Sequence, residues 1–203
     1  MEIMNTLEYI VKKYNLDISD TSKPIKLSIS RWHELGKLFN ELKFKKAVEI
    51  GVYRGRFTER IARRAPNMEI VGVDSWEVYA GYKDYSKNDL ENEAEKAARQ
   101  RLVNFPNVKL IKGWSLDVAN QFEDESLDWV FIDANHDYEC VVADIAAWSP
   151  KVRKGGIVSG HDYFVQKKLN FGVIQAVDGW RSAYNTGPLF TLRDKCPTWM
   201  YIK

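Results

Sequence analysis

Lys46-Ala-Val-Glu-Ile-Gly-Val-Tyr-Arg-Gly-Arg-Phe-Thr58 decides the fold of this chain, together with Glu69-Ile-Val-Gly-Val-Asp74. Residues 47–50 form a short apolar run of the kind that makes a buried parallel strand. Gly51 and Gly55 follow, where the chain must turn sharply and leave its backbone open to a ligand. A helix is expected from about Arg56. The next strand ends at Asp74, where an acidic side chain can accept hydrogen bonds from a ribose diol, so the segment predicts a nucleoside-binding βαβ unit.

The glycine spacing argues against a dinucleotide site. Such a site needs glycines at the first, third and sixth positions of the loop, so that a pyrophosphate can lie on the helix N-terminus. Here those positions hold Gly51, Tyr53 and Arg56. Glu49, just before the loop, would repel a pyrophosphate but suits a cationic ligand. A nicotinamide dehydrogenase is therefore a poor interpretation.

The pattern Glu-x-Gly-x-x-x-Gly at residues 49–55 resembles motif I of the class I S-adenosylmethionine-dependent methyltransferases. Two later segments add to the resemblance: Phe131-Ile-Asp-x-x-His-x-Tyr138 and Gly155-Gly-x-x-x-x-His-Asp-Tyr163. They are similar to the subgroup of small-molecule and sugar O-methyltransferases, and more distantly to catechol O-methyltransferase. The resemblance covers residues 46–203. It implies a Rossmann-like α/β fold with a seven-stranded sheet and S-adenosylmethionine as cofactor.

The order of apolar segments agrees with this fold class. Strands are expected near residues 47–50, 69–74, 108–112, 127–132, 156–160, 189–192 and 198–202, and helices alternate with them. Such alternation predicts a mostly parallel sheet with helices on both faces. The last two strands are close enough in sequence to pair as a hairpin, so one of them must run antiparallel.

Residues 1–45 are expected to form an N-terminal helical extension packed on a methyltransferase domain at 46–203. Residues 1–15 show the periodicity of an amphipathic helix, and residues 17–26 are polar and contain Pro24, which indicates a linker. Ser30 is a suitable N-cap for a second helix that reaches Leu42.

The resemblance assigns cofactor contacts to several positions. Glu49, Gly51 and Tyr53 would surround the methionine moiety, Asp74 would bind the ribose, and Ser115 would lie next to the adenine. Further cofactor contacts are expected at Gly55, Ser75, Trp76 and Asp133. Two alternatives remain open. Glu49 and Tyr53 could be loop scaffolding, and the aromatic residues of segment 75–88 could pack on the helix expected at 89–101 instead of contacting a ligand.

Asp133 and Asp162 follow two neighbouring predicted strands, and carboxylates that converge at a sheet edge suit Mg²⁺. In the catechol-type relatives a metal at these positions chelates a vicinal diol. This chain departs from them, because Tyr163 stands where they have an amide ligand. The alternative is that Asp133 caps the next helix and orients substrate without a metal.

Two of the three histidines flank these carboxylates. His136 stands where catechol-type enzymes place a lysine base, and an imidazole can take a hydroxyl proton at neutral pH. His161, next to Asp162, is the second candidate, whereas His33 has no such context.

The composition sets limits on location and partners. The 203 residues carry 30 basic and 28 acidic side chains, a balance that speaks against nucleic acid or an anionic membrane as partner. The two cysteines predict no disulfide framework, and the N-terminus lacks the pattern of a signal peptide, so a cytoplasmic protein is expected. The expected function is methylation of a hydroxyl on a small molecule, such as a sugar or a polyhydroxylated natural product. The rival is a protein of the same fold that binds a nucleoside cofactor without methyl transfer, and homo-oligomerisation is left open.

Overall fold

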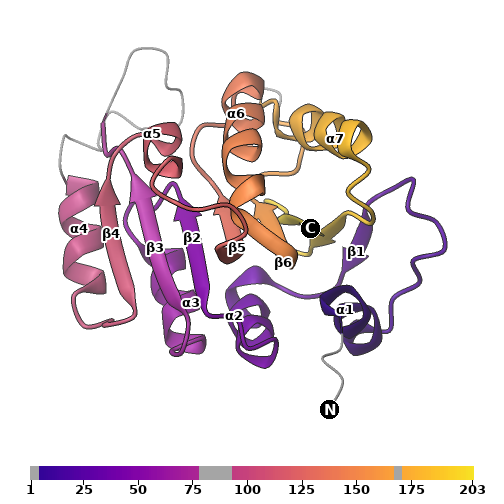
Figure 1. Cartoon of the computed structure of the whole chain (residues 1–203), viewed down its shortest axis with the longest axis horizontal. Coiled ribbons are helices and arrows are strands. Elements are labelled where there is room, and N and C mark those ends of the chain that lie inside the picture. The colour runs from indigo at the N-terminus through magenta and orange to yellow at the C-terminus, as the bar shows by residue number, and fades with distance from the viewer. Residues whose placement is uncertain (1–4, 78–92, 167–170) are drawn as a thin grey trace.

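The computed structural model describes residues 5–77, 93–166 and 171–203. Its centre is an eight-stranded sheet in the order β1-β7-β8-β6-β5-β2-β3-β4 (Figure 1). The strands are β1 (Ile25–Leu27), β2 (Lys46–Ile50), β3 (Glu69–Asp74), β4 (Val108–Lys112), β5 (Leu127–Ile132), β6 (Val152–Gly160), β7 (Phe190–Leu192) and β8 (Trp199–Ile202). Only β8 runs against its neighbours, because its pairings with β6 and β7 are antiparallel and the other pairings are parallel.

Helices cover both faces of the sheet. On one face lie α1 (Thr6–Tyr14), α2 (Arg31–Glu41) and α3 (Arg56–Arg64), with α4 (Glu93–Leu102) beside α3. On the other face lie α5 (Ser115–Ala119), α6 (Tyr138–Trp148) and α7 (Val173–Tyr184), and a 3₁₀ turn at Ser149–Lys151 leads from α6 into β6. This arrangement leaves the carboxyl ends of the parallel strands free to form a site.

Strand alternation distributes the side chains between two cores. In β5, Trp129 and Phe131 join the core under α2 and α3, while Val130 and Ile132 join the core under α6. The same alternation in β2 places Val48 and Ile50 with α6 and turns Glu49 to the opposite face. Glu49 is therefore buried on the α3 side of the sheet, below the loop that follows β2.

The predicted fold class is confirmed, with one addition. All seven expected strands are present, and the antiparallel strand is β8. The predicted linker at residues 17–26 is wrong for its last two residues. Ile25 begins β1, which pairs with β7 and adds an eighth strand to the sheet. Three residues at a sheet edge are too short to show a strand periodicity in the sequence.

The predicted helices differ from the structure mainly at their ends. Ser30 is the N-cap of α2, as expected, and its Oγ accepts a hydrogen bond from the backbone of Trp32. Helix α6 ends at Trp148, where the 3₁₀ turn containing Pro150 follows. Helices α5 and α7 lie in gaps where the alternation predicted helices, although the sequence had given no bounds for them.

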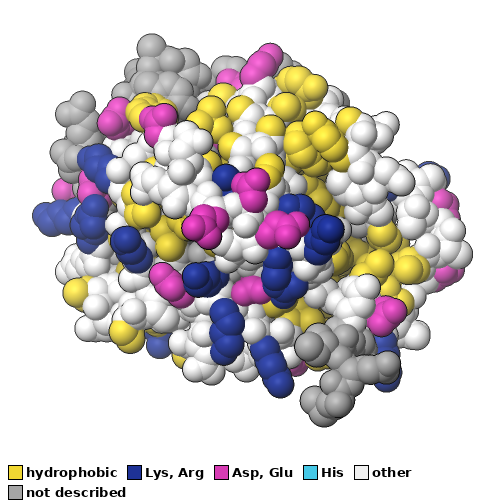
Figure 2. Space-filling model, in the orientation of Figure 1, with side chains coloured by type: hydrophobic (Ala, Val, Ile, Leu, Met, Phe, Trp, Pro, Cys, Tyr) yellow, Lys and Arg dark blue, Asp and Glu magenta, His cyan; other side chains and the backbone are white. Residues whose placement is uncertain are grey.

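Charged side chains of both signs are mixed over the face shown in Figure 2, as the net charge of +2 suggests. Within the described residues, no helix combines the length and the apolar character that a membrane span requires.

Candidate functional site

A cavity of about 710 Å³ opens over the carboxyl ends of the central parallel strands. Its wall contains seven of the residues expected at the site: Gly51, Tyr53, Asp74, Ser75, Ser115, Asp133 and His136. Residues that the sequence did not suggest also line it, among them Trp114, the N-cap of α5, Leu116 of α5, and Glu139, Cys140 and Asp144 of α6. The cavity thus runs from the end of β3 to the end of β5.

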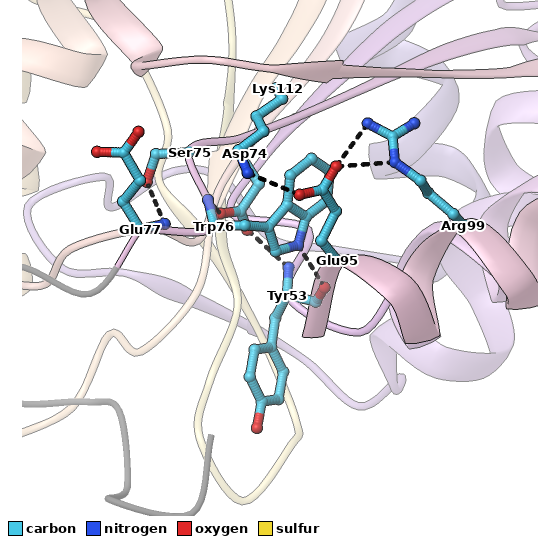
Figure 3. A network of polar contacts seen from close by, with 8 residues as sticks. All are labelled: Tyr53, Asp74, Ser75, Trp76, Glu77, Glu95, Arg99 and Lys112. Atoms are coloured by element: carbon cyan, nitrogen blue, oxygen red, sulfur yellow. Dashed lines mark hydrogen bonds and ion pairs between the residues drawn. The ribbon is translucent and has the colours of Figure 1, made fainter. Parts of the chain in front are cut away.

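Asp74 organises the loop at one end of this cavity. Its Oδ2 accepts a hydrogen bond of 2.7 Å from the backbone N–H of Tyr53, and its Oδ1 accepts one of 2.7 Å from the backbone N–H of Trp76 (Figure 3). Burial raises the pKa of Asp74, and these backbone donors oppose the shift. A carboxylate oxygen has more than one acceptor position, so Asp74 can hold the loop and still receive a ligand hydroxyl.

Trp76 lies on the other side of this loop. Its side chain joins a buried cluster with Val52 of the loop and with Ala98 and Leu102 of α4. Its indole N–H donates to the Tyr53 carbonyl at 2.8 Å (Figure 3). Trp76 is buried and does not line the cavity. The structure therefore corrects the expected cofactor contact of Trp76 and favours the alternative, packing on the following helix. The other aromatic residues of segment 75–88 that the prediction involved, Tyr79, Tyr82 and Tyr85, lie outside the described residues.

Different contacts require glycine at the two loop positions, Gly51 and Gly55. Gly51 has φ +89°, and a Cβ there would lie 2.0 Å from the carbonyl oxygen of Asp133, so the loop can approach β5 only without a side chain. Gly55, with φ +70°, is the N-cap of α3 and faces Leu102 of α4. Gly55 does not line the cavity, so its expected cofactor contact is corrected to helix packing.

Glu49 lies beneath the loop, with its side chain on the α3 face of the sheet. It is 2% exposed, and its Oε2 has no hydrogen-bond partner among the described residues. Burial raises the pKa of Glu49 to about 8; the Thr58 hydroxyl and the Arg31 guanidinium oppose the shift. Glu49 is thus a buried residue under the loop and not part of the cavity wall.

The other end of the cavity holds the predicted cluster of carboxylates and histidines. His136 Nε2 lies 2.9 Å from Asp162 Oδ2 and 3.5 Å from Asp133 Oδ1. His161 Nδ1 lies 3.2 Å from Asp162 Oδ2 and 3.6 Å from Asp133 Oδ1. The four side chains are therefore brought together as the strand order predicted, although His161 and Asp162 stand behind the cavity wall.

Electrostatics distinguish the two histidines. Burial disfavours the charged form of His161, but Asp133 and Asp162 outweigh it and raise its pKa to about 9. Burial likewise opposes ionisation of Asp133 and Asp162, yet the histidines hold the pKa of each carboxyl below its usual range. His161 is thus protonated at neutral pH and cannot accept a proton there.

Sequence reasoning missed Arg31. It begins α2, is buried, and its guanidinium Nη1 lies 3.6 Å from Asp133 Oδ2. The guanidinium also lies 4.8 Å from the ring centroid of Trp32 and 5.0 Å from that of Phe57. No local motif pointed to it, because the contact joins the N-terminal extension to the end of β5.

Asp133, His136 and Asp162 also offer one ligand atom each within 4.8 Å of one another. Two carboxylates and an imidazole suit a divalent cation that accepts oxygen and nitrogen ligands. Tyr163, which follows Asp162, donates its hydroxyl to Asp178 of α7 at 2.7 Å and is not among the three grouped ligand atoms.

Comparisons with known proteins agree with this fold. An O-methyltransferase from Bacillus cereus in complex with S-adenosylhomocysteine (SAH) superposes with a TM-score of 0.63 at 17% identity, over 99% of this chain and 90% of that chain. The SAH-bound methyltransferase PaMTH1 from Podospora anserina gives a TM-score of 0.56 at 18% identity, over 81% of this chain and 74% of that chain. At these identities the likeness shows the fold.

A curated relative is similar in sequence. It is the uncharacterised protein y4gI of Sinorhizobium fredii, 28% identical over an alignment of 144 residues that covers 68% of this chain. This chain spans only 15% of the length of that relative. A family model described as a methyltransferase domain matches residues 48–163, more than half of the chain. The resemblance expected from the motifs is confirmed, and the chain belongs to the methyltransferase-domain family.

Proposed function

We propose that this protein transfers the methyl group of S-adenosylmethionine to a hydroxyl oxygen of a small molecule, with sugars and polyhydroxylated natural products as the acceptor class. One observation carries the proposal: a single cavity has a ribose-type carboxylate, Asp74, in its wall at one end and the His136 cluster at the other. The structural neighbours with bound SAH support the cofactor, since their fold is the same.

The chain's own residues account for binding and positioning. Asp74 would accept hydrogen bonds from the ribose hydroxyls, and the loop through Gly51 and Tyr53 would hold the methionine end. Positioning matters most, because methyl transfer is an in-line displacement in which a well-held geometry supplies ~7–11 kcal/mol of the barrier.

His136 is our candidate for the base that removes the acceptor proton. It lines the cavity, and the Asp162 carboxylate at 2.9 Å can orient the imidazole and stabilise the imidazolium that forms after proton transfer. His161 would assist as a fixed positive charge that keeps both carboxylates ionised.

The same cluster has a second candidate role, which is to bind a divalent cation. Asp133, His136 and Asp162 favour this role, because each offers one ligand atom and these atoms lie within 4.8 Å of one another. Mg²⁺ or Mn²⁺ held there would lower the pKa of a bound acceptor hydroxyl. Since His136 cannot serve as ligand and base at once, the two versions make different predictions for chelation.

We place the enzyme in the cytoplasm, because both cysteines, Cys140 and Cys196, are free thiols, as a reducing compartment would keep them.

The test of the proposed function combines binding with turnover. Calorimetry should detect binding of S-adenosylmethionine and SAH, and isotope from a labelled methyl group should appear on the oxygen of an acceptor in a panel of sugars, glycosides and polyols. Tighter binding of NAD than of SAH would overturn the cofactor assignment. Cofactor binding with label transfer only to non-oxygen acceptors would overturn the acceptor class, and binding with no transfer to a broad panel would favour the rival, a binding protein.

A further inference from the structure

The imidazole of His136 is contacted both at its edge and on its face. At the edge, Nε2 lies 2.9 Å from Asp162 Oδ2. On the face lies the ring of Phe171, with 4.5 Å between the two ring centroids and 19° between the ring planes. Aromatic rings stacked at this separation attract each other. Two independent contacts therefore act on the side chain that we propose as the base.

The start of α7 places Phe171 over His136. Gly172, the N-cap of α7, donates its backbone N–H to the carbonyl oxygen of His136 at 2.8 Å. A Cβ at Gly172 would lie 2.6 Å from the backbone of Tyr138, the first residue of α6, so the two helix starts approach this closely only because position 172 is glycine. Helices α6 and α7 also pack against each other (Figure 1). Phe171, the residue before Gly172, is held against the imidazole by this docking.

The contact at the edge does not by itself fix the orientation of the imidazole. The χ2 torsion of histidine is broad and roughly two-fold, so the ring can turn about its Cβ–Cγ bond and move Nε2 between nearby acceptors. Asp133 Oδ1, 3.5 Å from Nε2, is a second acceptor of this kind. A flat ring against the face of the imidazole opposes such a turn, because the turn would separate the two stacked rings.

Phe171 has no place in the cavity wall, whereas His136 lines the cavity. The Phe171 side chain is half-buried, and Phe164 packs against it with 6.2 Å between the ring centroids and 77° between the ring planes. An effect of Phe171 on the reaction would therefore act through His136 and not through a contact with a ligand.

We propose that Phe171 is a positioning residue of the methyl transfer, whose ring keeps the imidazole of His136 in the one orientation in which Asp162 holds Nε2. The proposal rests on the proposed function, since it takes His136 as the base that meets the acceptor hydroxyl. Misplacing a reacting group by about 1 Å can cost about a hundredfold in rate. The loss of the Phe171 ring should therefore lower kcat, whereas cofactor binding, which depends on other parts of the cavity, should not change.

The test compares the variants Phe171→Leu and Phe164→Leu of the whole protein. Both phenylalanines are half-buried, but the ring that stacks on His136 is that of Phe171, so Phe164→Leu is the matched control for lost packing. With the acceptor that takes label in the panel described above, Phe171→Leu should lower kcat by about tenfold to a hundredfold. Its KM for the acceptor and its SAH affinity should stay close to those of the wild type. Phe164→Leu should keep a kcat near the wild-type value, and Phe171→Tyr, which retains a flat ring, should restore it.

A second measurement needs no acceptor. The chain has three histidines, so the ring protons of His136 can be identified in a proton NMR spectrum by their disappearance in His136→Ala. The stacked ring of Phe171 should shift these protons upfield in the wild type and in Phe171→Tyr. In Phe171→Leu the shift should be lost, because no aromatic ring then covers the imidazole.

A Phe171→Leu protein with the wild-type kcat would overturn the positioning role. Equal losses of kcat in the two Leu variants would overturn it as well, since they would indicate a general loss of packing, and so would His136 signals that are the same in Phe171→Leu as in the wild type. A wild type that binds SAH but methylates no acceptor would overturn the proposed function instead. The NMR signals would then still decide whether Phe171 fixes the imidazole, so the two failures are distinguishable.

Discussion

Arg31 Nη1 lies 3.6 Å from Asp133 Oδ2, so the first residue of α2 reaches the carboxylate that ends β5. The guanidinium is buried, its Nε and Nη1 make no hydrogen bond within the described residues, and aromatic rings lie within 6 Å. The N-terminal extension is therefore part of the charge balance of the site and not only a cover for the sheet.

Replacement of Arg31 by Met should destabilise the protein. Removing one partner of a buried ion pair typically costs about 3–5 kcal/mol. The cost should be smaller here, because the histidines beside Asp133 still compensate part of its charge. We expect the free energy of unfolding, measured by urea denaturation at pH 7.5, to fall by at least about 2 kcal/mol. Arg31→Lys is the matched control. It keeps the charge but loses the planar group over the rings, so its free energy of unfolding should lie between those of the wild type and the Met variant. A Met variant as stable as the wild type would show that the pair contributes nothing.

Glu49→Gln should change how stability depends on pH. The folded-state pKa of Glu49 is raised from 4.5 to about 8, so between these values the unfolded chain releases a proton that the folded protein keeps. Stability is then lost as pH rises through this window. The Gln variant lacks this loss, so its unfolding free energy relative to wild type should increase from pH 5 to pH 8 by at least about 1.4 kcal/mol, the equivalent of one pKa unit. A difference that is constant across this range would contradict a buried protonated Glu49.

Asp74→Ala should weaken SAH binding by about 1–3 kcal/mol, because the loop loses an acceptor for two backbone N–H groups and the ligand loses one for its ribose. Calorimetry of the variant measures the loss. Trp76→Phe serves as the comparison: it removes the hydrogen bond to the Tyr53 carbonyl and part of the buried indole, but it keeps the Asp74 carboxylate, so it should weaken binding less. If the Phe variant loses as much affinity as the Ala variant, loop order and not ribose contact accounts for the effect.

His136→Ala should lower turnover by about 10²–10⁴-fold and leave SAH affinity nearly unchanged, as expected for a general base. His161→Gln should have the smaller effect on turnover, because His161 is protonated at neutral pH. Single-turnover rates with labelled cofactor separate the two variants. A silent His136→Ala together with a large loss in His161→Gln would move the base to the second histidine.

Treatment with EDTA should distinguish the two versions of the cluster. If His136 is the base in a metal-free site, turnover should survive chelation and should not increase with added Mg²⁺ or Mn²⁺. If Asp133, His136 and Asp162 hold a cation, activity should vanish and return with the metal. Asp133→Asn would then raise the metal concentration needed for half-maximal rate, a shift that the metal-free version does not predict.

The sequence by itself determined the alternating fold and the strand ends that carry the site. Apolar runs in β2, β3 and β5 are local signals, and each predicted strand ends at a residue that the structure places at the same edge of the sheet. Because parallel strands share one carboxyl edge, Asp74, Asp133 and Asp162 could all be assigned to that edge from the sequence, with Asp133 and Asp162 converging there.

Only the tertiary structure decided which neighbouring side chains face the cavity. Trp76 and Gly55 lie beside predicted ligand contacts but pack on α4, and Glu49 turns to the α3 face through strand alternation. Arg31 and Asp144 reach the site from α2 and α6, and no local pattern marks them because their partners, Asp133 and Ser115, are distant in sequence. Periodicity reports which face of its own element a residue occupies, whereas the partner on that face depends on how helices pack over the sheet.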